Sequence, residues 1–185
     1  MYNYYERGVM MATRIIKAFE ETHPALRFIG KKYTNKDRVN GSYAAKWQEW
    51  FKEGYFKPLD LLGETTQVDN GYLGFMKANL KHFDETFEYW IGAFFDPYAV
   101  VPKGYEYFDL PESKVGICYI QGKESEGLYQ MHDDCVDTLL KHHILKQNNI
   151  KSNRLQCVER YNCPRFTEPN EHNDVILDYG IYILD

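Results

Sequence analysis

One order of patterns occurs twice along this chain of 185 residues, and it constrains the fold more than any single motif. Each occurrence is a strand, then a helix, then two strands. In the first half the strand patterns cover 25–33, 72–76 and 87–95, and the helical pattern covers 42–55. In the second half the strand patterns cover 115–120, 155–161 and 175–183, and the helical pattern covers 128–144. We therefore predict an α+β fold of duplicated β-α-β-β units, with repeat one at about 25–96 and repeat two at about 104–185. Two such units joined edge to edge give an antiparallel sheet with both helices on one face and a central groove.

The segment before the first repeat has a helical pattern. Val9, Ala12, Ile16 and Phe19 recur at spacings of three and four residues, and Pro24 disfavours helix just before it. We predict a helix over 4–21 and treat 1–24 as an N-terminal helical extension of a binding domain that covers 25–185. Residues 97–111 are expected to form an extended connection between the repeats.

Aromatic side chains, 16% of the residues, are frequent enough to line a cavity as well as a core. In the helix predicted at 42–55 they form a stripe of Tyr43, Trp47, Trp50 and Phe51. Such a stripe is typical of a buried helix face, and two tryptophans on it also fit a cavity wall. We expect Trp47 or Trp50, but not both, to face the groove.

The strand predicted at 155–161 contains a carboxylate on an otherwise apolar face. Strand alternation places Leu155, Cys157, Glu159 and Tyr161 on one face and Gln156, Val158 and Arg160 on the other. Glu159 is then either an ordinary sheet carboxylate, paired with Arg160 or a lysine, or a cation receptor inside an aromatic cavity. The pattern alone leaves both interpretations open.

Charge and composition argue against several function classes. The net charge is −5, and the clustered Lys and Arg of a nucleic-acid-binding surface are missing. A single N-terminal helix is too little for a helix-turn-helix module. No apolar run reaches the ~18 residues of a membrane span, and the first residues do not resemble a signal peptide. The four cysteines lack the short spacing of a metal site, so we expect no metal or cofactor and a cytoplasmic protein with reduced thiols.

Several segments resemble a known family. The run Gly104-Tyr105-Glu106-Tyr107-Phe108-Asp109-Leu110-Pro111, followed by Val115-Gly116-Ile117 and Gly122-Lys123, resembles the start of the second repeat in GyrI-like small-molecule-binding domains. These are also the effector-binding domains of AraC-type and related multidrug-responsive regulators. The last two strands of the family are similar to residues 159–166 and 175–183. The likeness covers most of the chain from about Ala25 onward, and it implies a pseudo-twofold pair of strand-helix-strand-strand units.

The resemblance also implies a function, namely binding of hydrophobic, often cationic, small molecules in the central groove. In many members a glutamate on the penultimate strand lies at the bottom of the pocket, and it matches Glu159, with Tyr161 on the same face. The further candidate ligand-binding residues are Trp47, Trp50, Trp90, Phe94 and Tyr119. Because we find no DNA-binding module, we expect a stand-alone drug- or effector-binding protein, with a separate regulatory protein as a potential partner in transcription regulation.

Two other functions stay open. Some stand-alone members of the superfamily resemble hydrolases that open strained cyclopropane rings, and there Glu159 would activate water or stabilise developing positive charge, helped by the hydroxyl of Tyr161 or Tyr119. The gyrase-inhibiting relatives imply a protein-binding inhibitor module instead. That alternative predicts an exposed acidic surface and no deep cavity.

Overall fold

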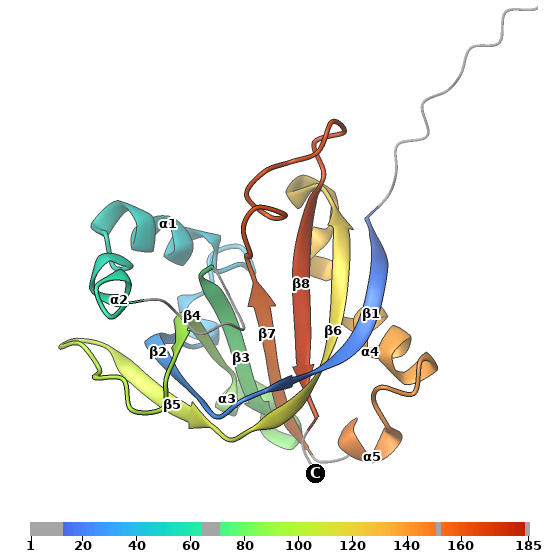
Figure 1. Ribbon diagram of the computed structural model, residues 1–185, viewed down its shortest axis with the longest axis horizontal. Coiled ribbons are helices and arrows are strands. Elements are labelled where there is room, and N and C mark those ends of the chain that lie inside the picture. The colour runs from blue at the N-terminus through green and yellow to red at the C-terminus, as the bar shows by residue number, and fades with distance from the viewer. Residues whose placement is uncertain (1–12, 64–70, 151–152, 184–185) are drawn as a thin grey trace, which may run out of the picture.

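The computed structural model describes residues 13–63, 71–150 and 153–183, which form an α+β fold around one antiparallel sheet (Figure 1). The eight strands are β1 (Arg14–His23), β2 (Leu26–Tyr33), β3 (Leu73–Asn79), β4 (Glu88–Phe95), β5 (Glu106–Leu110), β6 (Ser113–Gly122), β7 (Arg154–Arg160) and β8 (Val175–Tyr182). The α-helices are α1 (Ala44–Glu53), α2 (Lys57–Asp60), α3 (Phe83–Thr86), α4 (His132–Lys141) and α5 (Gln147–Ile150). Short 3₁₀ turns η1 (Asn35–Asp37), η2 (Leu80–His82), η3 (Glu124–Glu126) and η4 (Leu128–Gln130) connect them.

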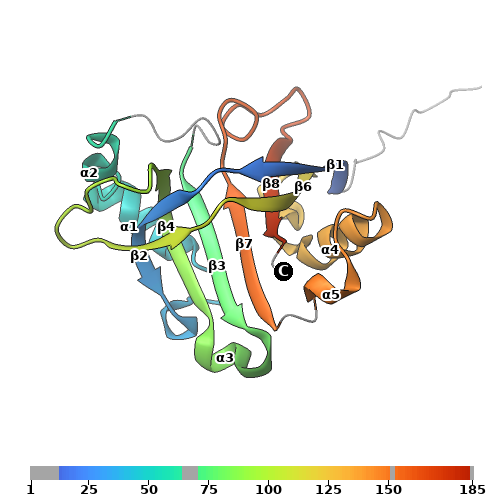
Figure 2. The same ribbon diagram turned by 60° about the horizontal axis from the view of Figure 1, so that its bottom comes forward.

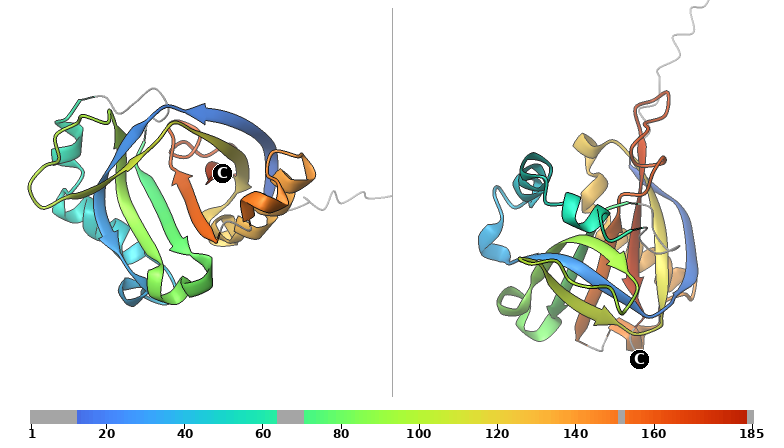
Figure 3. Two further views of the ribbon diagram at one scale, coloured as in Figure 1. Left: turned by 90° about the horizontal axis from the view of Figure 1, so that it is seen from below. Right: turned by 60° about the vertical axis from the view of Figure 1, so that its left-hand side comes forward.

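The strands lie in the order β1-β6-β8-β7-β3-β4-β2-β5, so the central pair joins β3 to β7. In this pair Gly74 lies opposite Glu159. Each edge strand pairs with a strand from the other half of the sequence. The first strand, β1, pairs with β6, and β5 pairs with β2. The sheet curves strongly, and β1 arches across one side of it (Figures 2 and 3).

The two faces of the sheet are buried in different ways. The face that carries the helices, here called the helical face, packs against Tyr43 and Trp50 from α1 and its N-cap, and against Cys135 and Leu139 from α4. The opposite face, the strand face, folds onto itself and forms a second core without helical residues. Its buried members are Leu26, Phe28, Leu73, Phe75, Trp90, Phe94, Leu110, Val115, Ile117, Val158 and Tyr182.

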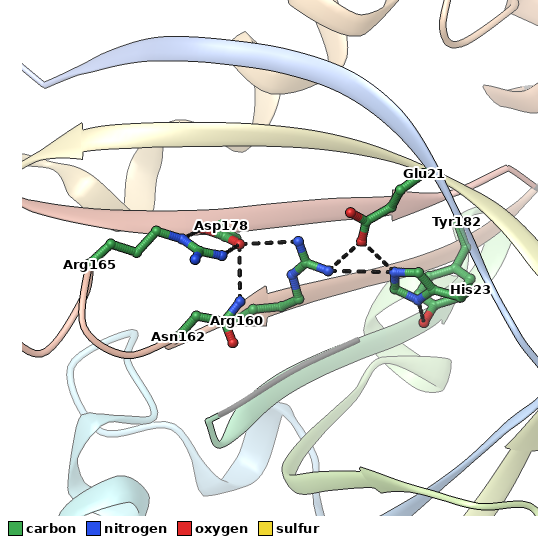
Figure 4. Close-up of polar contacts among 7 residues, drawn as sticks. All are labelled: Glu21, His23, Arg160, Asn162, Arg165, Asp178 and Tyr182. Atoms are coloured by element: carbon green, nitrogen blue, oxygen red, sulfur yellow. Dashed lines mark hydrogen bonds and ion pairs between the residues drawn. The ribbon is translucent and has the colours of Figure 1, made fainter. Parts of the chain in front are cut away.

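A buried charged network crosses the strand face and attaches β1 to the sheet (Figure 4). We call it the Arg160 network. Arg160 forms ion pairs with Glu21 on β1 and with Asp178 on β8, and Arg165 also pairs with Asp178. The Nε2 of His23 lies 2.7 Å from Glu21 Oε1. Each carboxylate in the network therefore has at least one cationic or imidazole partner.

The strands and helices predicted from the repeated pattern are present with shifted ends, but the N-terminal helix is wrong over Arg14–His23. This segment is β1, and residues 1–12 of the predicted extension lie outside the described residues. A register shift between Ile15 and Lys17 inserts one extra residue, so Ile15 and Ala18 both pack on the helical face. A bulge of this kind gives a strand the three-residue spacing of a helix. The connection predicted at 97–111 also contains the short edge strand β5.

None of the helices in the described parts of the chain is long and apolar enough to cross a membrane.

Candidate functional site

A pocket of about 1380 Å³ opens on the helical face, above the central strands of the sheet. Its walls come from both halves of the sequence. The aromatic and charged residues that line it include Arg38, Tyr43, Trp47, Phe87, Tyr89, Glu124, Tyr129, His132, Glu159, Tyr161 and Phe166, together with Met76. A pocket of this volume is large enough for a drug-sized molecule. The protein-binding alternative predicts no deep cavity, so this pocket argues against that alternative.

Glu159 lies on the sheet side of this pocket and is only 5% exposed. Its Oε2 accepts hydrogen bonds from the hydroxyl of Tyr161 at 2.9 Å and from that of Tyr89 at 3.2 Å. Its Oε1 lies 3.2 Å from Nε2 of His132, which donates because an ionised carboxylate only accepts. The Trp47 ring nitrogen in turn donates to the Tyr89 hydroxyl at 3.0 Å. The carboxylate is thus fixed by three donors, one on β4, one on α4 and one just after β7.

Gly74 makes room for this arrangement. A Cβ atom at position 74 would lie 2.5 Å from the Tyr89 hydroxyl and 3.1 Å from Oε2 of Glu159. Contacts this close force neighbouring atoms to move. Because Gly74 pairs with Glu159 across the β3–β7 ladder, the absence of a side chain there lets the hydroxyl and the carboxylate meet above the backbone.

Aromatic rings hold the donors in place. Tyr43 stacks on Tyr89 with ring centres 4.1 Å apart and planes 2° from parallel. Trp47 and Tyr161 pack edge to face with ring centres 4.8 Å apart, and His132 stacks on Tyr179 with ring centres 4.4 Å apart. Each ring that binds Glu159 therefore packs against a second ring, which fixes its orientation.

The tyrosine donors stay protonated. Burial, followed by the nearby Glu159 carboxylate, raises the pKa of Tyr89 and of Tyr161 well above the ordinary value. Among the described residues, no lysine or arginine forms an ion pair with Glu159. Arg38 lines the same pocket, but its guanidinium lies over the Tyr43 ring, 5.6 Å from the ring centre. The negative charge is therefore solvated by hydroxyl groups without being cancelled by them.

The sequence-based candidates separate into two groups. Glu159, Tyr161 and Trp47 line the pocket. Trp50 is fully buried in the core, where its ring nitrogen donates to the Tyr33 hydroxyl at 2.8 Å, so only one of the two tryptophans faces the pocket, as expected.

Trp90, Phe94 and Tyr119 do not line the pocket, because they pack on the strand face. Phe94 is fully buried there, and Tyr119 lies beside Arg165 with the guanidinium 4.9 Å from the ring centre. Strand alternation explains the error. Tyr89, the neighbour of Trp90 along β4, points to the helical face, so an error of one residue changes the face.

Two contacts of Glu159 were missed from the sequence, namely Tyr89 and His132. Tyr89 shares a face with Ile91 and Ala93 on β4, but both faces of this strand are apolar, so alternation does not distinguish the face of Tyr89 from that of Trp90. His132 is the first residue of α4, and the helical pattern had been extended back to Leu128 through what are turns. No local pattern indicates that this histidine reaches β7.

No family model and no curated protein matches this chain. Solved structures do. A Staphylococcus aureus MU50 protein described as a candidate bacterial transcription regulation protein aligns with a TM-score of 0.62 and 20% identity, over 91% of this chain and 99% of that one. The structure of SAV2435 bound to tetraphenylphosphonium aligns with a TM-score of 0.65 and 19% identity, over 91% and 94% of the two chains. At these identities the likeness shows the fold.

A hydrolase from Listeria innocua is a more distant match, with a TM-score of 0.49, 13% identity, and coverage of 89% of this chain and 90% of that one. That similarity is too low to support an argument about hydrolysis.

Proposed function

We propose that this protein is a GyrI-like receptor for hydrophobic organic cations, and that it acts in drug or effector sensing or sequestration, alone or with a separate regulatory protein. The observation that carries the proposal is the Glu159 carboxylate, 5% exposed on the wall of an aromatic pocket and hydrogen-bonded to tyrosine hydroxyls in place of a lysine or arginine.

The physical argument starts from the cost of burial. A buried charge is unfavourable unless hydrogen bonds and an opposite charge compensate it. The two tyrosine hydroxyls supply hydrogen bonds, while the opposite charge is left to a ligand. At about 4 Å, two opposite charges attract by about 4 kcal/mol at an effective dielectric constant of roughly 20, before desolvation is subtracted. The surrounding rings add cation–π and dispersion contacts, which favour delocalised or quaternary cations.

The structural comparison supports the same ligand class. The structure of SAV2435 is bound to tetraphenylphosphonium, a lipophilic cation, and it shares the fold over 91% of this chain. We further propose that the two halves of the sheet are duplicated units, because β2, β3 and β4 flank α1 in the sequence as β6, β7 and β8 flank α4.

Tetraphenylphosphonium titration followed by tryptophan fluorescence tests the proposal. Trp47 lines the pocket, whereas Trp50 and Trp90 are buried in the two cores, so binding should change mainly the Trp47 emission. The variant Trp47→Phe should lose most of the signal while calorimetry still detects binding. Tetraphenylborate, which has the same shape and the opposite charge, is the matched ligand and should bind at least about 100-fold more weakly. Equal affinity for the two ions would overturn the proposal.

The hydrolase alternative rests on Glu159, Tyr161 and His132, which are within hydrogen-bond reach of one another through the carboxylate. Such a group has the parts of an acid-base site. Incubation with a cyclopropane-containing electrophile, followed by mass spectrometry, separates the two functions. A receptor returns the compound unchanged, and a hydrolase adds one water to it in a reaction that Glu159→Gln abolishes.

A further inference from the structure

Among the hydrogen-bond partners of Glu159, His132 is the one that can gain a positive charge by protonation. Its Nε2 lies 3.2 Å from Oε1 of Glu159, and the two side chains are 35% and 6% exposed. No other cationic side chain in the described parts of the chain forms an ion pair with this carboxylate. A neutral imidazole only donates a hydrogen bond there, whereas an imidazolium cancels the negative charge.

We propose that protonation of His132 regulates the pocket, so that a cationic ligand and a proton compete for the charge of Glu159. The inference rests on the function proposed above and concerns the same site. In the protonated protein, Glu159 already has a cation at hydrogen-bond distance, and a second cation in the pocket meets a neutral pair. In the deprotonated protein, the full carboxylate charge is available to the ligand.

The surroundings of His132 point to this residue as the group that titrates. The other titratable or charged side chains that lie near it or line the same pocket are Glu159 on β7, Tyr161 just after this strand, Tyr179 on β8, Tyr89 on β4, Glu124 and Tyr129 on η3 and η4, Asp133 and Asp134 on α4, and Arg38, Tyr43, Asp60, Tyr72 and Cys163. Burial raises the pKa of all six of these tyrosines, so they remain neutral between pH 5 and 8. Histidine is the side-chain type whose charge ordinarily changes in that interval.

Geometry lets the imidazole hold its place in both states. His132 stacks on Tyr179 with ring planes 11° from parallel, so its orientation is fixed by the ring contact as well as by the carboxylate. Because the residue is about one-third exposed, protons exchange with solvent without opening the fold. Competition between the proton and the ligand therefore requires only that the charge of His132 changes, and the chain does not have to rearrange.

Linkage fixes the size of the effect. If the protonated form excludes the ligand, the apparent dissociation constant rises tenfold for each pH unit below the titration of His132, as one proton is released per ligand bound. Partial exclusion gives a smaller slope with the same sign. An anion of the same shape shows the reverse dependence, because it is favoured by the imidazolium.

The experiment is isothermal titration calorimetry of the whole protein with tetraphenylphosphonium between pH 5.5 and 8.5, in pairs of buffers with different ionisation enthalpies. We expect affinity to fall about tenfold or more from pH 7.5 to pH 5.5, with proton release on binding at the lower pH. His132→Gln keeps an amide donor near the Nε2 position without a titratable charge. It should bind with an affinity that varies less than about twofold across the same range.

His142→Gln is the matched control, since His142 is an exposed histidine at the C-cap of the same helix and should keep the wild-type pH dependence. If wild type binds tetraphenylphosphonium with a flat pH profile and no proton release, the inference is overturned and the proposed function stands. If no binding occurs at any pH, the proposed function fails. A pH profile in His132→Gln equal to that of wild type assigns the titration elsewhere and also overturns the inference.

Discussion

Glu159 and Arg160 are neighbours on β7, both are buried, and they point to opposite faces of the sheet. On the strand face, Arg160 lies between two carboxylates, Glu21 and Asp178. On the helical face, Glu159 faces a cavity and is held by two tyrosine hydroxyls and one imidazole. The strand β7 thus carries an arginine paired with two carboxylates on one face, and on the other face a carboxylate without a lysine or arginine partner among the described residues.

The difference separates two uses of a buried charge. In the Arg160 network the opposite charges satisfy each other and connect β1, β7 and β8, so removal of one member leaves another uncompensated. At Glu159 both carboxylate oxygens accept hydrogen bonds, but no lysine or arginine in the described parts of the chain pairs with the negative charge. A fold gains no stability from a buried charge without an opposite charge, which is why we regard the first cluster as structural and propose the second as a ligand-binding site.

The largest expected effect tests the structural side of this comparison. Asp178→Asn removes the fully buried carboxylate that Arg160 and Arg165 share. Because Arg165 loses its buried counter-charge and Arg160 keeps only Glu21, we expect the free energy of unfolding to fall by about 3–5 kcal/mol in urea denaturation. Lys52→Gln, which breaks the exposed Lys52–Glu53 pair, is the control and should change it by less than about 1 kcal/mol.

The second prediction tests the ligand side. Glu159→Gln keeps the shape of the side chain and removes its charge. Tetraphenylphosphonium affinity should fall by about 30- to 100-fold, or about 2–3 kcal/mol, while the free energy of unfolding stays the same or rises. Calorimetry and urea denaturation on one preparation measure both. A loss of stability comparable to that of Asp178→Asn would make Glu159 a structural residue and abolish the contrast.

Gly74→Ala is expected to have an intermediate effect. Its Cβ would meet the Tyr89 hydroxyl, so we expect about 1–2 kcal/mol of destabilisation and weaker ligand binding. The double variant Gly74→Ala/Tyr89→Phe removes the atom that the Cβ meets. A double-mutant cycle should show a favourable coupling, and strict additivity would mean that the hydroxyl is not the source of the strain.

The smallest effect concerns pH. Burial alone would raise the pKa of Glu21, but hydrogen bonds and charge from His23 and Arg160 outweigh it, so the pKa is lowered. A lowered carboxyl pKa contributes stability above the unfolded value near 4.5, and that contribution is lost as pH falls through the folded pKa. The melting temperature should therefore fall less steeply between pH 6 and pH 3 in Glu21→Gln than in the wild type. Curves of identical slope would place the acid sensitivity on another carboxylate.

How far the sequence could predict these features depends on local alternation. β7 carries polar residues among apolar ones, so the face of Glu159 and Tyr161 was predicted correctly. β4 is apolar on both faces, since it lies between two cores, and alternation there cannot say which face Trp90 or Phe94 takes. The contact between His132 and Glu159 joins α4 to β7 and depends on tertiary packing that no local pattern encodes.

The exchanged edge strands have a consequence for how the molecule holds together. Since β1 completes the sheet beside β6 and β5 completes it beside β2, each half lends its first strand to the other. If the chain were cut between β4 and β5, the first piece would contain β1 but lack β5, the edge strand beside its β2. The second piece would contain β5 but lack β1, the edge strand beside its β6. Each half of the chain therefore completes the sheet of the other half, so neither half contains all the strands of its own side of the sheet.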